Sequence, residues 1–134
     1  MTRPTHPVEL LCCGIATQEG WFDADPTVTP RARNNPGDIR WAHQLGASAP
    51  GYDGEGPPPV ATCESAGHGV TILFRQVWLQ VAEGQTARQI IAQWAPPTEN
   101  DTNAYIDDVL KWTGLPADVP VLDLLPPLVQ LNLS

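Results

Sequence analysis

A carboxylic acid lies among the apolar positions of the first helical segment. Residues 6–20 read HPVELLCCGIATQEG, and Glu19 follows Ile15 by four residues and Cys12 by seven. This spacing places all three on one face of a helix. Burial favours the neutral form of a carboxyl, and a carboxyl protonated near neutral pH can act as a general acid. Glu19 is therefore the first candidate for catalysis, and the alternative is an exposed residue at a helix end.

Two other kinds of hydrolytic site have less support. The histidines, His6, His43 and His68, form no HExxH motif, and no Cys-x-x-Cys pair occurs, so the spacing predicts neither a metal site nor a cofactor. Cys63 precedes a predicted helix, where a thiol becomes more acidic, and His68 follows five residues later. Residues five apart on a helix point in different directions, so we expect no nucleophile–base pair there. Phosphate-binding glycine motifs are absent.

A second group of polar residues lies in a turn-rich segment. Residues 33–40 read RNNPGDIR, which combines two amides, a Pro-Gly turn and flanking arginines. Asn before Pro, followed by a Gly that tolerates positive φ, explains the motif as a local turn. The amides of Asn34 and Asn35 would equally suit the hydroxyl and N-acetyl groups of a sugar. Spacing alone favours the turn.

Helical segments must position these residues. Residues 70–81 carry apolar side chains at i, i+3 and i+4 spacing, and Gly84 ends the segment. A short helix begins at Thr86, with Gln89 as its capping-box partner, and ends before Pro96. The expected buried residues of the two segments are Val70, Leu73, Phe74, Val77, Trp78, Val81, Ile90, Ile91 and Trp94.

The last predicted helix begins with Asn100 or Asp101 as its N-cap and ends at Gly114. Its expected buried face consists of Tyr105, Ile106, Val109, Leu110 and Trp112. Residues 116–134 are a proline-rich tail that we expect to pack over the core.

The segment 21–59 is rich in proline and glycine, without clear periodicity, and we expect an irregular loop there. A loop of this length inside a compact domain is unusual and often functional. Residues 39–41 and 60–62 are the candidates for a small β-hairpin. The pattern predicts a mainly α fold: one domain over residues 1–134, with its core over about 8–115.

Composition narrows the class of protein. The chain has 134 residues, of which 42% are hydrophobic, as expected for a soluble globular domain. Its net charge of −8 disfavours binding to nucleic acid or anionic lipid but not to carbohydrate. We find neither a secretory signal nor an apolar run that could span a bilayer. Three cysteines, two of them adjacent, predict free thiols in a protein made in the cytosol. We also expect the protein to be a monomer.

Three blocks, in this order, resemble a family of phage and prophage lysozyme-like proteins. They are IATQEGW at residues 15–21, RNNPGDI at 33–39 and TARQIIAQWAPPTENDTNAY at 86–105. The family pairs an A-x-x-E-G helix end with an N-N-P-G-N-[IL] loop, and the resemblance covers most of residues 8–115. Two features depart from the family: Asp38 stands where asparagine is commoner, and residues 44–59 form an insertion.

The resemblance implies a lysozyme-like fold and a substrate. The family is similar to muramidases and lytic transglycosylases, which cleave the β-1,4 bond between N-acetylmuramic acid and N-acetylglucosamine in peptidoglycan. Their acid is a glutamate at the end of the first core helix, and the matching position is Glu19. The match also implies a cleft near Asn34, Asn35, Gly37 and Tyr105.

Further sugar contacts and a second carboxylate complete the expected site. Trp21 and Trp41 are candidates to stack on sugar rings, although burial is the commoner fate for Trp41. An inverting glycosidase needs a second carboxylate about 6.5–9.5 Å from the first, whereas a transglycosylase can use one glutamate alone. The candidates for this second carboxylate are Asp25, Asp38, Glu64 and Asp101.

Two functions follow from the sequence. The first is a peptidoglycan-cleaving glycosidase, by hydrolysis or by lytic transglycosylation, encoded by a phage or prophage, made in the bacterial cytoplasm and acting on the cell wall. The second is a virion or cell-wall-binding protein that keeps the fold without catalysis, because fold likeness does not secure activity. An acid at the helix end favours the first.

Overall fold

The computed structural model describes residues 5–126 and shows a mainly helical chain with a small antiparallel sheet. The elements in chain order are α1 (Pro7–Glu19), α2 (Thr29–Ala32), β1 (Ala47–Ser48), β2 (Thr62–Cys63), α3 (Ala66–Ala82), α4 (Ala87–Ala92), α5 (Glu99–Thr113) and the 3-10 helix η1 (Val121–Leu124). The mainly α class is therefore confirmed.

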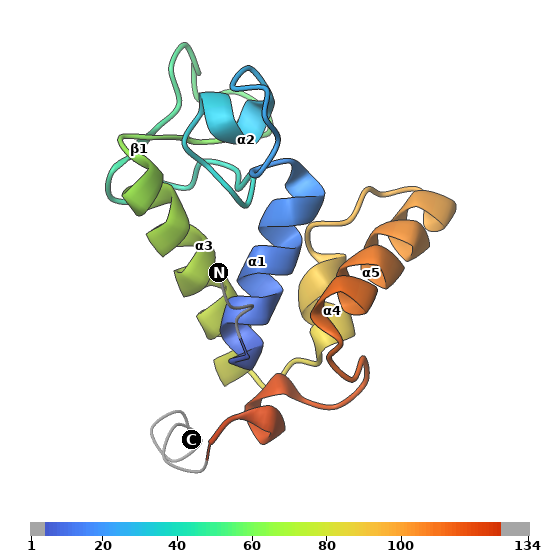
Figure 1. Cartoon of the computed structure of the whole chain (residues 1–134). Coiled ribbons are helices and arrows are strands. Elements are labelled where there is room, and N and C mark those ends of the chain that lie inside the picture. The colour runs from blue at the N-terminus through green and yellow to red at the C-terminus, as the bar shows by residue number, and fades with distance from the viewer. Residues whose placement is uncertain (1–4, 127–134) are drawn as a thin grey trace.

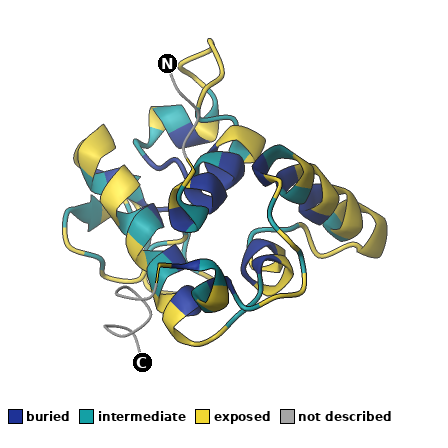
Figure 2. Cartoon of the chain, turned by 60° about the horizontal axis from the view of Figure 1, so that its bottom comes forward, coloured by how far each residue is buried: buried dark blue, intermediate teal, exposed yellow. Residues whose placement is uncertain are grey.

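Helix α1 lies at the centre of the structure, between α3 on one side and α4 with α5 on the other (Figure 1). Its Leu11 and Ile15 are fully buried, and they belong to one apolar cluster that extends through all four helices to η1. The buried sides of the helices face one another and their outer sides are exposed (Figure 2). The irregular segment with α2 and β1 covers the end of the bundle at which α1 terminates (Figure 1).

The bounds of α1 follow from its terminal residues. Pro7 occupies the first turn, and the His6 ring accepts a hydrogen bond from the Val8 amide at 3.2 Å. Gly20 ends the helix in the left-handed region, at φ 92°, with its amide directed at the carbonyls of Ala16 and Thr17. Glycine reaches this conformation without a Cβ penalty. The predicted helix is confirmed, with Glu19 as its last residue.

The capping box of α4 is also confirmed: the Thr86 side chain accepts from the Gln89 amide, and the Gln89 side chain accepts from the Thr86 amide. The predicted N-cap of α5 is wrong. Thr98 is the N-cap, and its hydroxyl donates to the Asp101 carboxylate at 2.6 Å. The helix therefore begins as soon as Pro97 allows, with Asp101 already in its first turn, where a negative charge is favourable.

Helix α3 begins earlier than the apolar stripe predicted, at Ala66 after the N-cap Ser65. Val70 was expected in the core but is 37% exposed. The buried stripe passes instead through Gly69, Leu73 and Val77. The backbone of Asn34 lies against Gly69, where an added Cβ would be 1.8 Å from the Asn34 carbonyl oxygen. This close approach turns the neighbouring Val70 to the outside.

The predicted hairpin is present only as a single bridge. Arg40 pairs with Val60, and the amides of Trp41 and Ala61 donate to Pro59 and Ile39, both at 2.9 Å. The two named strands pair Ala47 with Cys63 and Ser48 with Thr62. β1 thus lies inside the 44–59 insertion. Both β1 and the short helix α2 fall within residues 21–59, where we expected an irregular loop.

The tail packs on the core as predicted, as far as it is described. Val121 and Leu125 are buried, and the Val121 amide donates to the Gln85 carbonyl at 3.0 Å. Residues 127–134 lie outside the described part of the chain. Cys12, Cys13 and Cys63 are free thiols. No helix within residues 5–126 combines the length and the hydropathy needed to cross a membrane.

Candidate active site

Glu19 and Tyr105, which are 86 residues apart, meet between α1 and α5. The Tyr105 hydroxyl donates a hydrogen bond to Glu19 Oε1 at 2.9 Å. Tyr105 is buried in the core, whereas Glu19 is half-buried at the end of its helix. The core thus holds one oxygen of the carboxyl in place while part of the group stays accessible.

The position of Glu19 determines its acidity. The pKa of Glu19 is raised from its ordinary value of 4.5 to about 6. Burial is the main cause, the Tyr105 hydrogen bond acts against it, and the negative charge of Asp38 adds to the rise. The pKa of Tyr105 is raised as well, by burial and then by the charge of Glu19, so its hydroxyl remains a donor. The carboxyl is therefore protonated in a substantial fraction of molecules at mildly acidic pH.

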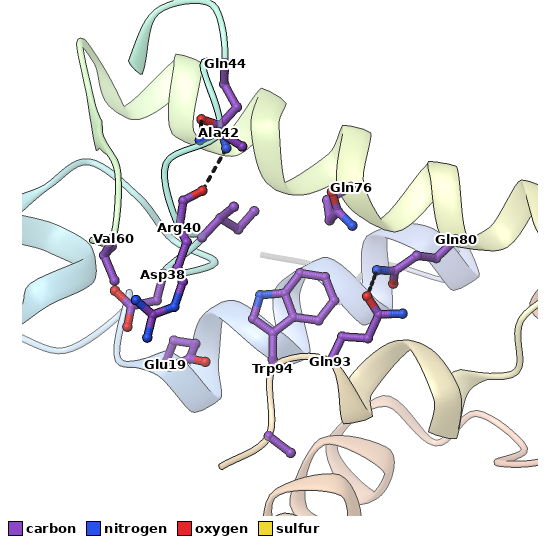
Figure 3. Close-up of a pocket in the computed structure, with 12 residues that line it drawn as sticks. Glu19, Asp38, Arg40, Ala42, Gln44, Val60, Gln76, Gln80, Gln93 and Trp94 are labelled. Atoms are coloured by element: carbon purple, nitrogen blue, oxygen red, sulfur yellow. Dashed lines mark hydrogen bonds between the residues drawn. The ribbon is translucent and has the colours of Figure 1, made fainter. Parts of the chain in front are cut away.

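Glu19 opens into a groove with a volume of about 510 Å³. Figure 3 shows Glu19, Asp38 and Arg40 at one end of the groove, and Gln80 and Gln93 beyond Trp94 at the other. The full lining consists of Glu19, Asp38, Ile39, Arg40, Ala42, Gln44, Val60, Gln76, Gln80, Gln93, Trp94 and Ala95. Its walls come from α1, the loop after α2, α3 and the end of α4.

Among the four candidates for a second carboxylate, only Asp38 lines the groove with Glu19. Burial raises the pKa of Asp38, and the guanidinium groups of Arg33 and Arg40 act against this rise. Its Oδ1 atom is buried without a hydrogen-bond partner. Asp38 also has a φ of 50°, a conformation rare for a residue with a side chain. An uncompensated buried oxygen next to the candidate acid is typical of a functional site.

The other three acids have local structural partners. Asp25 accepts hydrogen bonds from the amide and the hydroxyl of Thr27, at 2.9 and 2.7 Å. Glu64 pairs with His68 at 2.9 Å on the exposed start of α3. Asp101 receives the Thr98 hydroxyl described above. None of these three lines the groove of Glu19.

The two amides of the RNNPGDI turn support the loop. Asn35 is 0% exposed, and its Nδ2 donates to the carbonyls of Ile39 and Ala61, both at 2.9 Å. Its Oδ1 accepts from the Ile39 amide at 3.0 Å, which satisfies the side chain. Asn34 Nδ2 donates to the Cys63 carbonyl at 3.3 Å. Asn35 thus lies out of reach of a ligand, and the turn interpretation describes both residues.

Gly37 connects this loop to the opposite wall. Its carbonyl accepts a hydrogen bond from Trp94 Nε1 at 2.7 Å. A Cβ at this position would lie 2.9 Å from Leu73 Cδ1, so Gly37 packs closely against α3 and an added methyl group would displace the Leu73 side chain. The loop is therefore fixed against α3 and α4, and this fixes Asp38, the next residue, at the groove.

The sequence analysis missed the polar wall opposite Glu19. Trp94 was expected in the core but is half-buried in the groove wall. Gln80 is 3% exposed and hydrogen-bonds to Gln93, and its Oε1 has no partner. The missed signal is of the same kind as for Glu19, because Gln80 follows Val77 by three residues on the buried stripe of α3.

Neither Trp21 nor Trp41 lines the groove of Glu19. Trp21 is half-buried and packs against the apolar core. Trp41 contacts the rings of His43 and Tyr52, with centroids 4.1 and 6.0 Å away, beside a separate hollow formed with the insertion. Within residues 5–126, no cluster of three or more His, Cys, Asp or Glu side chains is arranged to hold a metal ion.

Comparison of the chain with models of protein families, with curated proteins and with solved structures finds no match. The residues and the geometry of the groove therefore have to indicate the function.

Proposed function

We propose that this chain is a lysozyme-like glycosidase that cleaves the β-1,4 bond between N-acetylmuramic acid and N-acetylglucosamine in peptidoglycan. The observation that carries the proposal is Glu19: a half-buried carboxyl with a pKa of about 6, at the end of the central helix, open to a groove. The choice of peptidoglycan as the substrate comes from the three sequence blocks that resemble phage lysozyme-like proteins.

Protonation is the difficult step in breaking a glycosidic bond, because the bridging oxygen is a poor leaving group until it receives a proton. In the proposed reaction Glu19 donates its proton to that oxygen as the carbon–oxygen bond breaks. The positive charge that develops on the sugar ring is stabilised by the Asp38 carboxylate on the same groove. In hydrolysis the oxygen of a water molecule then bonds to the anomeric carbon, whereas in transglycosylation the sugar's own 6-hydroxyl oxygen does so and closes a 1,6-anhydro ring. In either case the proton that the attacking hydroxyl or water loses returns to Glu19.

The arrangement of elements supports a lysozyme-like fold. The acid ends the central helix α1, and the loop between α2 and β2 faces it across the groove, with the small sheet beyond. The segment with α2 and β1 thus meets the helical bundle at the end of α1 (Figure 1), and Glu19 is the last residue of that helix. Trp94 and the Gln80–Gln93 pair offer an indole and amides to the sugar rings and N-acetyl groups.

Digestion of purified peptidoglycan, followed by mass spectrometry of the released muropeptides, tests the proposal. We expect soluble disaccharide-containing fragments. Reducing-end products would assign hydrolysis, and 1,6-anhydro products would assign transglycosylation. Binding to peptidoglycan without release of fragments would instead identify a wall-binding or virion protein and overturn the proposal.

A further inference from the structure

The groove of Glu19 continues along α3 into a larger cavity of about 1040 Å³. The two share four lining residues, which are Ile39, Ala42, Gln44 and Gln76. The far wall of the larger cavity is one face of α3, where His68, Thr71 and Arg75 succeed one another at helical spacing. A ligand that passes Glu19 can therefore extend a branch along α3.

The two ends of this continuous groove differ in charge. Both Glu19 and Asp38 line the first part, whereas no Asp or Glu lines the second. The chain as a whole has 15 acidic and 7 basic residues, so a cavity that carries an arginine and no acid is unusual for it. Glu64 does not line this cavity, and its carboxylate is paired with the His68 ring at 2.9 Å. The second part of the groove thus suits an anionic group.

Arg75 has no partner of its own. The other described arginines are engaged: Arg31, Arg33 and Arg40 donate to the carbonyl oxygens of Asp23, Val60 and Pro58, and Arg88 pairs with Asp118. Among residues 5–126, only Arg75 and Lys111 carry a side-chain cation without a hydrogen bond or ion pair. Of these two, Arg75 lines the α3 cavity and Lys111 does not. A guanidinium suits a carboxylate because it can donate two parallel hydrogen bonds.

We propose that the α3 cavity binds the peptide stem that peptidoglycan carries on N-acetylmuramic acid, with Arg75 paired to a carboxylate of the stem. This inference depends on the proposed function and names the part of the substrate beyond the scissile bond. In the polymer the lactyl carboxyl of N-acetylmuramic acid is consumed in the amide bond to the stem, so the free carboxylates of a stem-bearing strand lie on its stems. Ile72 of α3 and Leu45 of the loop before β1 also line this cavity and offer apolar contacts for the alanine methyl groups of the stem.

Binding measurements with a non-cleaving variant test this proposal. Glu19→Gln protein is titrated calorimetrically with two soluble tetrasaccharides of alternating N-acetylglucosamine and N-acetylmuramic acid. One carries stem peptides, and in the other, stem-free ligand the lactyl carboxyls are capped as methylamides so that they carry no charge. We expect the stem to tighten binding by about tenfold, the effect of one charge-assisted hydrogen bond. Adding Arg75→Gln should abolish this preference, while adding Lys111→Gln, on the exposed side of α5, should preserve it.

Equal affinity for the two tetrasaccharides, binding of neither, or a stem preference that survives Arg75→Gln would overturn the inference. Cleavage by wild-type protein separates this result from the proposed function. If wild type cleaves stem-free and stem-bearing strands equally well, the glycosidase stands and the stem site fails. If stems bind through Arg75 but neither strand is cleaved, the stem site stands and the catalytic proposal fails.

Discussion

The Tyr105 hydroxyl donates to Glu19 Oε1 across the interface between α5 and α1, at 2.9 Å. This bond stabilises the charged carboxylate, whereas burial and the neighbouring Asp38 stabilise the neutral acid. The acidity of Glu19 is thus set by opposing contributions from separate residues, which substitution can test one at a time.

Replacing Tyr105 with phenylalanine removes the contribution that favours the charged form. We expect Tyr105→Phe to raise the pKa of Glu19 above about 6. Because a general acid must be protonated, the alkaline limb of the pH–activity profile should move to higher pH. The loss of the hydrogen bond should also cost about 1 kcal/mol of stability. A limb that stays in place, or moves to lower pH, would show that this bond does not tune the acid.

Replacing Asp38 with asparagine should have the opposite effect on Glu19. The negative charge of Asp38 raises the pKa of Glu19, so Asp38→Asn should lower it. The ¹³C chemical shift of the Glu19 carboxyl, followed by NMR against pH, measures this without substrate. Cleavage at the optimal pH should fall as well, since the proposed stabilising charge is lost. If the pKa of Glu19 is the same in Asp38→Asn as in wild type, the charge of Asp38 does not influence Glu19 and the prediction is wrong.

Glu19 should make the stability of the chain depend on pH. Its folded pKa, about 6, lies above its ordinary 4.5, so its stabilising contribution is complete below 4.5 and is lost as pH rises through 6. Glutamine cannot ionise and can still accept from Tyr105. Glu19→Gln should therefore be more stable than wild type at pH 8, by up to about 1 kcal/mol after solvent screening, and equal to it at pH 4. Thermal melts at both pH values check this, and a pH-independent difference would contradict it.

Gly69 tests the placement of the loop that carries Asp38. A methyl group there would meet the Asn34 carbonyl oxygen at 1.8 Å, so Gly69→Ala must displace the loop or the helix. We expect a loss of about 1–3 kcal/mol and reduced cleavage. Gly67→Ala is the matched control on the same helix, because its Cβ would come no closer than 3.8 Å to the Ser65 hydroxyl. Denaturant unfolding of both variants measures the difference, and equal stability would place the loop elsewhere.

Local patterns predicted the elements of the bundle well. The ends of α1 follow from Pro7 and Gly20, and the start of α4 follows from Thr86 and Gln89, because these signals act within a few residues. The position of Glu19 on an apolar stripe was visible in the same way.

The loop and the far wall of the groove depend on contacts between distant segments. Asn35 is buried because Ile39 and Ala61 surround it, and Trp94 reaches the groove because the Gly37 carbonyl accepts its indole N–H. No spacing along the chain encodes these partners. The sequence offered Asp38 as one of four candidates for the second carboxylate, and only the folded structure places it on the same groove as Glu19.

The rate of muropeptide release by Glu19→Gln shows whether Glu19 is the general acid. The comparison uses wild type and Glu9→Gln, an exposed acid on the same helix, with folding of all three checked by circular dichroism. We predict a fall of about 10²–10⁴-fold for Glu19→Gln and no change for Glu9→Gln. Release at the wild-type rate by Glu19→Gln would rule out Glu19 as the general acid.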